Sequence, residues 1–450
     1  MYELTRWFTK WEETHGEPMR LCVDPENLDL WRWEHGVYVN LTPTPQTWHH
    51  CIAGETGEFI RPARAQELHW HAGATKARRL DGYERHDLNG AEPWINLASG
   101  VVDLRTGQHR PHGEEWLTTH QVPHEYIEDE VQVQRETKAL HDWMTLAMGA
   151  ETAEVMWTLF GYALVGGNPG QLLVILQGPG GSGKGTLSNV LRTLLGEGGY
   201  SSLSLGKVGG RFTSHLLHRT PVNICGDVVG GVVPRYGDLL ALTGGDPVHA
   251  DRKGRDGFEF RWDGLLVMAT NDTLSLPKGA SSRTGWWRRA LYIDVEHPPV
   301  PLGERLNSRA MLDRIMPNPS AAASRAVRAI SEAVQKDAGA LVQPSTAMQQ
   351  AAARARLTGD VVADWAMVRL EQAHGQQVEA SDAWADFQVW AIHNGITYPH
   401  GSRRFYGDLE TVVQREGLGH RDDTRTATSR CRFVGVQLGG PQLQILRSMS

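Results

Sequence analysis

The sequence predicts an α/β protein built around a phosphate-binding loop, with an N-terminal α+β region and a small C-terminal domain. Two observations predict the α/β centre. The apolar run Leu172–Leu176 leads into the glycine-rich stretch Gly178–Thr186, and a helical pattern of apolar residues starts near Lys184. From residue 171 to residue 296, strand-like and helix-like segments then alternate, which is typical of a sheet with crossover helices.

The stretch between this strand and this helix has the composition of a P-loop. Its residues are Gly178, Pro179, Gly180, Gly181, Ser182, Gly183, Lys184, Gly185 and Thr186. Glycines let backbone N–H groups turn towards a phosphate, and the helix N-terminus adds partial positive charge. The sequence therefore predicts that these residues bind ATP with Mg²⁺. Gly185 stands where a hydroxyl residue usually holds the metal, so Thr186 is the hydroxyl candidate.

Length and composition limit the classes of protein to consider. A chain of 450 residues is expected to form more than one domain. No apolar run approaches the roughly 20 residues of a membrane span, and the N-terminus has no signal-peptide pattern. The four cysteines are scattered, which predicts a reducing, cytoplasmic location. The net charge of −7 means that a nucleic-acid-binding surface would consist of local basic loops.

Five regions are predicted along the chain. They are an N-terminal α+β region (1–125), a helical collar (126–168), the α/β core (169–300), a helical segment (301–375) and a winged-helix-like DNA-binding domain (376–450). The first region includes a hairpin over Asn96–Gly107, because turn residues separate two apolar stretches.

The winged-helix prediction rests on the pattern of the last region. Two amphipathic helices are followed by the strand-like run Cys431–Leu438, and Arg403 and Arg404 begin the second helix. A helix that starts with basic residues in this position suits the major groove of DNA, so both arginines are predicted to bind DNA. An ordinary helical cap remains the alternative for the same pattern.

Two polar residues are predicted to end core strands next to the loop. The strand-like run Val222–Asp227 ends in a carboxylate that is placed to hold Mg²⁺ or to orient the attacking water. The run Leu265–Thr270 is followed by Asn271, whose amide is placed to position water near the γ-phosphate. Asp227 and Asn271 are therefore predicted catalytic residues, and Asp227 shares the metal with Thr186.

Adjacent arginines follow in the run Trp286–Leu291. An arginine that one subunit offers to the γ-phosphate held by its neighbour stabilises the charge of phosphoryl transfer, by about 10³–10⁵ in rate. Arg289 is the first candidate for this role and Arg288 the second, with an ordinary ion pair as the alternative for both.

A hairpin with a basic tip is predicted between Asp227 and Asn271. The segment Leu242–Arg255 ends in a cluster of cations, and Phe258–Phe260 then alternates like a returning strand. Arg252, Lys253 and Arg255 are predicted to grip the phosphates of one nucleic-acid strand, although a solvated turn would show the same charges.

Taken in order, these motifs resemble the superfamily 3 helicase domain of phage, plasmid and poxvirus primase–helicases. The likeness rests on Gly178–Thr186, Asp227, Leu242–Pro247, Ala269–Asn271, Trp287–Arg289, the upstream Asn96–Gly107 segment and the C-terminal region Trp384–Leu438. The resemblance implies an AAA+-like core that assembles into a hexameric ring with ATP between subunits. It also implies 3′-to-5′ translocation on single-stranded DNA. The family commonly has glutamate where this chain has Asp227.

The resemblance thus implies an ATP-hydrolysing replicative DNA helicase of a phage or plasmid, with single-stranded and forked DNA as its substrate. Fewer than 100 residues precede the Asn96 hairpin, so the chain is interpreted as a helicase without its own primase, or as one whose primase or polymerase is a separate polypeptide. Two alternatives stay open. The sequence Gly-Lys-Gly-Thr at 183–186 is also typical of nucleoside monophosphate kinases. Aspartate at 227 would suit a non-translocating origin-binding or loading factor that uses ATP as a switch.

Overall fold

The computed structural model describes most of the chain. The described residues are 20–24, 29–40, 78–79, 93–113, 116, 118–228, 231–252, 257–271, 274–276, 284–298, 306–336, 340–358, 361–393, 401–423 and 431–439. The contacts divide the chain into two compact units. The first consists of residues 1–272 and 283–352, and the second of residues 273–282 and 353–450.

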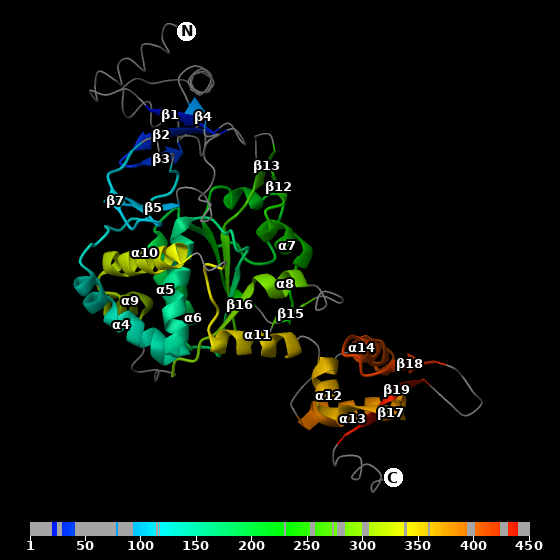
Figure 1. Cartoon of the computed structure of the whole chain (residues 1–450). Coiled ribbons are helices and arrows are strands. Elements are labelled where there is room, and N and C mark those ends of the chain that lie inside the picture. Colours follow the sequence, from blue (N-terminus) through cyan, green and yellow to red (C-terminus); the bar gives the residue numbers. More distant parts are fainter. Residues whose placement is uncertain are drawn as a thin grey trace, which may run out of the picture. The chain divides into compact units, whose positions relative to one another are not determined.

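A five-stranded parallel sheet forms the centre of the first unit (Figure 1). Its strands lie in the order β16-β8-β14-β10-β9. Their bounds are β8 (Leu173–Gln177), β9 (Tyr200–Ser201), β10 (Val222–Val228), β14 (Leu265–Thr270) and β16 (Ala290–Asp294). All six residues of β14 are buried, as expected for a parallel strand that is covered on both faces. The structure therefore confirms the α/β prediction for the centre of the chain.

Helices pack around this sheet and bury one continuous apolar core with it. They are α4 (Glu130–Met148), α5 (Ala150–Val165), α6 (Lys184–Leu195), α9 (Ser308–Ile315), α10 (Pro319–Gln335) and α11 (Thr346–Thr358). Helices α5 and α10 cross closely, since a Cβ on Gly161 would lie 2.2 Å from the carbonyl oxygen of Ala326. The helices predicted over 126–168 are confirmed, and the predicted helical segment 301–375 contains helices up to residue 369, where strand β17 (Leu370–Glu379) follows.

The N-terminal part contains two further sheets. Strands β1 (Leu21–Val23), β2 (Leu30–Glu34), β3 (Val37–Asn40) and β4 (Arg78–Arg79) form one, and β5 (Trp94–Leu97), β6 (Gly100–Asp103) and β7 (His109–Arg110) form the other. The predicted hairpin at Asn96 is present, with Leu97 paired to Gly100 across its turn. Its amide Asn96 Nδ2 donates to Gly36 O at 2.9 Å, which ties the two sheets together.

Along the chain, further short elements come between the five strands of the central sheet. They are η3 (Ser214–Leu216), β11 (Gly231–Val232), α7 (Tyr236–Gly244), β12 (Pro247–Ala250), β13 (Phe258–Arg261), β15 (Leu274–Ser275) and α8 (Thr284–Arg289). Strands β12 and β13 pair in antiparallel fashion and form the predicted hairpin, whose tip at 253–256 lies outside the described residues.

The second unit has its own core. Its elements are α12 (Val361–Arg369), β17 (Leu370–Glu379), α13 (Ala380–His393), α14 (Ser402–Arg415), β18 (His420–Asp422) and β19 (Arg432–Leu438), with an antiparallel sheet in the order β17-β19-β18. The buried carboxylate of Asp386 accepts from Trp365 Nε1 at 2.8 Å and from Arg369 Nη2 at 2.7 Å. The two predicted helices and the strand at 431–438 are confirmed, and α12 and β17 join them. Nowhere in the described part of the chain is a helix both long and apolar enough to span a bilayer.

Candidate nucleotide-binding site

The glycine-rich loop lies where a buried strand meets a helix. β8 ends at Gln177, and α6 begins at Lys184, as the sequence analysis predicts. Gly178 approaches the end of β16 so closely that a Cβ would lie 2.2 Å from Val295 O. Gly183, with φ of +100°, precedes the helix. The loop is thus held between the ends of two parallel strands and the start of one helix.

The start of α6 leaves the first N–H groups of the helix without a side-chain cap. Helices α4, α9 and α10 begin with side-chain caps from Asp129, Asn307 and Asn318, respectively. In contrast, the N-cap residue of α6 is Gly183, so the helix has no side-chain cap, and its first turn contains no acidic residue. The first N–H groups of a helix have no intrahelical partner, so an uncapped start leaves donors and partial positive charge for a phosphate.

Lys184 is folded back over the loop. Its ammonium donates to Gly178 O at 2.6 Å and to Pro179 O at 2.8 Å, and it lies 3.4 Å from Ser182 Oγ. The side chain is buried, and these oxygens satisfy the buried charge. A phosphate bound in the loop would take over this role, because an ammonium group is a strong phosphate partner.

A stacked aromatic pair packs against the end of the loop. The rings of Trp143, from α4, and His297, which follows β16, are stacked with centroids 5.3 Å apart. A Cβ on Gly183 would lie 2.8 Å from Trp143 Cζ2, and His297 N donates to Ser182 O at 3.2 Å. Helix α4 and the end of β16 therefore fix the last turn of the loop before α6.

The polar residue predicted after β14 lies at the same edge of the sheet as the loop. In the pairing of β14 with β8, Thr270 is opposite Gln177, so Asn271 and Gly178 leave neighbouring strands at the same level. Asn271 is exposed there. Its predicted role next to the γ-phosphate is compatible with this position and stays a prediction.

Asp227 belongs to β10, which pairs with the other side of β14. The pairing shifts register between Cys225 and Val228, and Val228 is opposite Thr270. The backbone of Asp227 is therefore at the same edge, within an irregularity of the strand. Its side chain lies outside the described part of the structure, so the Mg²⁺ role of Asp227 with Thr186 is untested.

The two arginines lie at the other edge of the sheet. Helix α8 ends at Arg289, and β16 starts at Ala290, which is opposite Leu173 at the beginning of β8. The five residues of β16 separate these arginines from the loop edge by about 16 Å. Neither arginine therefore lies next to the loop of its own chain.

The environments of the two arginines differ. Arg288 is exposed, and its Nη2 donates to Gln171 Oε1 at 3.0 Å. Arg289 turns inwards, where its Nη1 donates to Leu240 O at 2.6 Å and lies 3.3 Å from Thr243 Oγ1. Burial, followed by the charge of Arg288, lowers the pKa of Arg289. Arg288 is thus the more accessible cation of the pair.

The predicted DNA-binding residues fall into three groups. Arg252, next to the tip of the hairpin, donates to Asp29 Oδ2 at 3.0 Å and lies over the ring of Phe258. Lys253 and Arg255 lie outside the described residues. In the second unit, Arg403 is exposed in the first turn of α14, and Arg404 lies 3.6 Å from Asp408.

One surface feature next to the hairpin was not predicted from the sequence. Phe212 is 60% exposed, and the exposed Arg211 lies over its ring. Arg211 also forms an ion pair with Asp251, and its carbonyl oxygen accepts from Asp251 N at 2.9 Å. An exposed aromatic ring beside cations can stack on a nucleobase. The adjacent Gly209–Gly210 pair and the Arg-Phe dipeptide were the signal available in the sequence.

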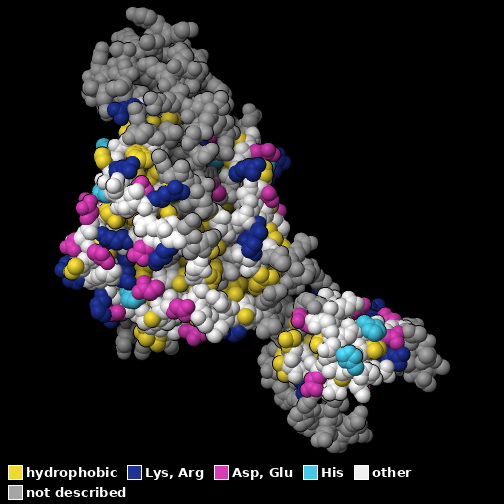
Figure 2. Space-filling view, viewed as in Figure 1, with side chains coloured by type: hydrophobic (Ala, Val, Ile, Leu, Met, Phe, Trp, Pro, Cys, Tyr) yellow, Lys and Arg dark blue, Asp and Glu magenta, His cyan; other side chains and the backbone are white. Residues whose placement is uncertain are grey.

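Charge of both signs covers the rest of the surface. Figure 2 shows Lys and Arg side chains interspersed with Asp and Glu over the visible described face. This agrees with the net charge of −7 and with the expectation that binding of a polyanion would depend on local basic elements.

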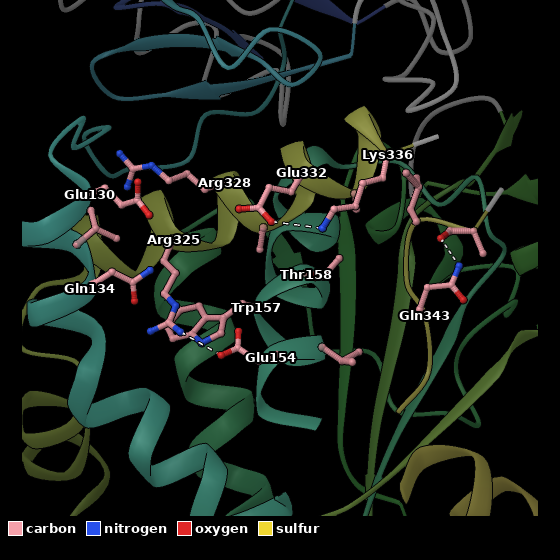
Figure 3. A pocket seen from close by; sticks show the side chains of 16 residues that line it. Glu130, Gln134, Glu154, Trp157, Thr158, Arg325, Arg328, Glu332, Lys336 and Gln343 are labelled. Atoms are coloured by element: carbon pink, nitrogen blue, oxygen red, sulfur yellow. Dashed lines mark hydrogen bonds and ion pairs between the residues drawn. The ribbon is translucent and has the colours of Figure 1, made fainter. Parts of the chain in front are cut away.

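A separate cavity of about 460 Å³ lies between α4, α5 and α10 (Figure 3). Arg325 covers the ring of Trp157 there, 4.5 Å from its centroid, and lies 3.6 Å from Glu154. Lys336 and Glu332 pair at 3.6 Å on the same rim. None of the residues Gly178–Thr186 lines this cavity, so it is distinct from the candidate nucleotide site.

Comparisons with known proteins agree with this fold. A protein family of unknown function, DUF5906, matches residues 176–289, a range that contains the glycine-rich loop and both arginines. The apo structure of the NrS-1 C-terminal region superposes with a TM-score of 0.50 at 11% identity, and the match covers 96% of this chain and 99% of that chain. An A-form apo structure of the same region gives a TM-score of 0.49 at 11% identity, covering 96% and 98%. At this identity the likeness extends to the fold alone.

Proposed function

We propose that this protein is an ATP-driven DNA motor, a helicase of the superfamily 3 type that works as a ring. In this proposal each subunit binds ATP at Gly178–Thr186 and receives an arginine from its neighbour. The core is a P-loop ATPase of the AAA+-like kind, and the second unit is a winged-helix DNA-binding domain.

One observation carries the proposal. The phosphate loop and the arginine pair lie at opposite edges of one parallel sheet, about 16 Å apart along β16. An arginine at the far edge cannot contact ATP in its own loop, but it can meet the loop of the next subunit in a head-to-tail ring. This arrangement also argues against a monomeric nucleoside monophosphate kinase, which needs its catalytic cations around its own loop.

The residues present suit ATP and Mg²⁺. The uncapped start of α6 and the ammonium of Lys184 provide donors for the phosphates. Hydroxyl and carboxylate oxygens are the ligands that Mg²⁺ prefers, so Thr186 and Asp227 are the proposed holders. When bound, the metal would neutralise charge on the phosphates. Asn271 is proposed to orient the attacking water.

Arg288 is the better candidate for the arginine that acts on the neighbour. It is exposed, whereas Arg289 is turned inwards onto α7. A finger must leave its own subunit and present its planar fork to another molecule's phosphate. The structure therefore favours the second candidate of the sequence analysis over the first.

Support for DNA binding comes from three places. Lys253 and Arg255 lie in the sequence between the paired strands β12 and β13, and the exposed Arg211–Phe212 pair lies next to Asp251, directly after β12. The second unit has the order helix, strand, helix, helix, strand, strand, with β17 next to β19. This is the outline proposed as a winged helix, with α14 and Arg403 towards DNA.

The deciding experiment is the ATPase rate with and without a single-stranded oligonucleotide. We expect DNA to raise the rate of the wild type, Lys184→Ala to abolish hydrolysis, and Lys253→Ala to remove the stimulation. Hydrolysis that ignores both DNA and Lys253→Ala would contradict the motor, and added nucleoside monophosphates would then test the phosphotransferase. DNA binding without hydrolysis would favour the loading factor.

A further inference from the structure

The turn from α7 into the hairpin has no role in the proposed chemistry. α7 ends at Gly244, and β12 begins at Pro247. The turn is tight, because Asp246 N donates to Ala241 O at 3.0 Å and Gly245 has φ of +77°. The end of α7 therefore determines where the root of the hairpin lies.

Arg289 is anchored to this end of α7. Its Nη1 donates to Leu240 O at 2.6 Å and lies 3.3 Å from Thr243 Oγ1. A Cβ on Gly244 would lie 3.3 Å from Arg289 Nη2, so the glycine leaves room for the guanidinium. A cation at the C-terminal end of a helix is also favoured by the helix dipole. The end of α7 thus packs around the guanidinium of Arg289.

Gln171 adds a second link to the same place. Its Nε2 donates to Gly244 O at 3.2 Å, and its Oε1 accepts from Arg288 Nη2 at 3.0 Å. One amide therefore joins the exposed arginine to the end of α7. Both links lie at the arginine edge of the sheet, whereas the chain's own phosphate loop lies at the other edge.

We propose that Arg289 and Gln171 are positioning residues that couple the DNA hairpin of each subunit to the nucleotide held by the neighbouring subunit. Arg288 contacts the neighbour's γ-phosphate, and a shift of α8 on ATP binding or loss is passed through both residues to α7 and β12. The hairpin accordingly follows the neighbour's nucleotide rather than its own. This inference rests on the proposed function.

The test measures the affinity for a labelled single-stranded oligonucleotide by anisotropy, once with a slowly hydrolysed ATP analogue and once with ADP. For the wild type we expect the two affinities to differ by about tenfold or more, as in coupled binding sites. In Arg289→Gln, Thr243→Val and Gln171→Ala we expect nearly equal affinities in the two states.

Arg325→Gln is the matched control. Arg325 is also a partly buried arginine that joins two helices, since its Nη1 donates to Thr137 Oγ1 at 3.0 Å, and burial lowers its pKa as for Arg289. It lies in α10, away from the hairpin. We expect it to keep the wild-type ratio of affinities even if its melting temperature falls.

Two outcomes would count against the inference in different ways. If the wild type binds DNA in a nucleotide-dependent manner and Gln171→Ala and Arg289→Gln keep the full ratio, the links are only structural and the inference is wrong. If the wild type shows no binding of DNA in either state, the proposed function itself fails. Gln171→Ala is included as a variant that should still fold, because Gln171 is only partly buried and its replacement leaves the core of α7 intact.

Discussion

At the scale of single residues, Gly183 is, like Gly178, a position at which the loop has no room for a side chain. Its φ of +100° and the 2.8 Å approach of Trp143 Cζ2 both oppose a Cβ. In Gly183→Ala the free energy of unfolding should fall by roughly 1–3 kcal/mol. ATP affinity should fall about tenfold, because the N–H groups before α6 are displaced. Thermal unfolding with and without ATP measures both effects.

Gly185→Ala is the control for this substitution. Gly185 lies in the first turn of α6, its φ is not positive, and nothing lies within 4 Å of an added Cβ. Alanine in a helix is favoured over glycine by roughly 0.5–1 kcal/mol. The melting temperature without nucleotide should therefore stay equal or rise. An equal loss of stability in both variants would show that the strain at Gly183 is not the cause.

His120 makes stability depend on pH. Burial lowers its pKa from 6.5 to about 4, and burial also lowers the pKa of His124. Between these values the unfolded chain binds a proton that the folded chain does not. Stability is therefore full above about pH 6.5 and is lost progressively as the pH falls towards 4.

Urea unfolding at pH 7.5 and at pH 5 tests this expectation. The free energy of unfolding should be lower at pH 5 in the wild type. The difference in the free energy of unfolding between pH 7.5 and pH 5 should be smaller in His120→Met, because methionine is an apolar side chain of similar size that does not titrate. An unchanged difference in the variant would assign the pH dependence to other groups, His124 first.

At the scale of elements, helix α4 supports the loop through Trp143. Trp143 Nε1 is buried without a hydrogen-bond partner in the described structure, so packing rather than hydrogen bonding determines the position of the indole. We expect Trp143→Phe to retain ATP affinity and Trp143→Ala to lose it about tenfold, because the loop end and His297 lose their support. Titration with a fluorescent ATP analogue measures the two affinities. If Trp143→Phe and Trp143→Ala lose ATP affinity equally, the contact of an aromatic ring with the loop does not determine that affinity.

Element by element, local pattern was enough to predict much of the core. The start of α6 at Lys184 follows from the change from glycines to apolar residues at helical spacing. Strands β8 and β14 follow from their continuous apolar runs. Strand β17 was missed, because the run Glu371–Gln377 is polar and mostly exposed and its pairing with β19 bridges a distant part of the chain.

At the scale of the whole molecule, a ring would let two inactive variants complement each other. In a mixture of Lys184→Ala and Arg288→Ala, the Lys184→Ala subunit can offer Arg288 to a neighbour whose loop is intact. Each variant alone should be inactive. Random assortment in a head-to-tail ring should restore up to about a quarter of the wild-type ATPase rate. No recovery from subunits that do assemble together would place the arginine in its own subunit's site, against the sheet geometry.

Direction of movement is also a property of the whole assembly. If the ring translocates 3′-to-5′, strand separation should require a fork with a single-stranded 3′ tail. A fork with only a 5′ tail should remain paired. Separation should weaken steeply with salt, since contacts to phosphates release counterions.

The sequence by itself determined the local parts of this protein: the strand, the loop and the helix that form the candidate phosphate site, and the strands that lead to Asp227 and Asn271. These parts follow from the spacing of apolar residues and from glycines at specific turns, which are local properties of the sequence. Only the tertiary structure decided which edge of the sheet each residue occupies. The order β16-β8-β14-β10-β9 makes β14 and β16 the neighbours of β8, so Asn271 leaves the sheet beside the loop. Because β16 runs parallel to β8, Arg288 and Arg289, which precede β16, lie at the end opposite to the loop, which follows β8. Strand order arises from packing between segments far apart in the chain, which no local pattern encodes.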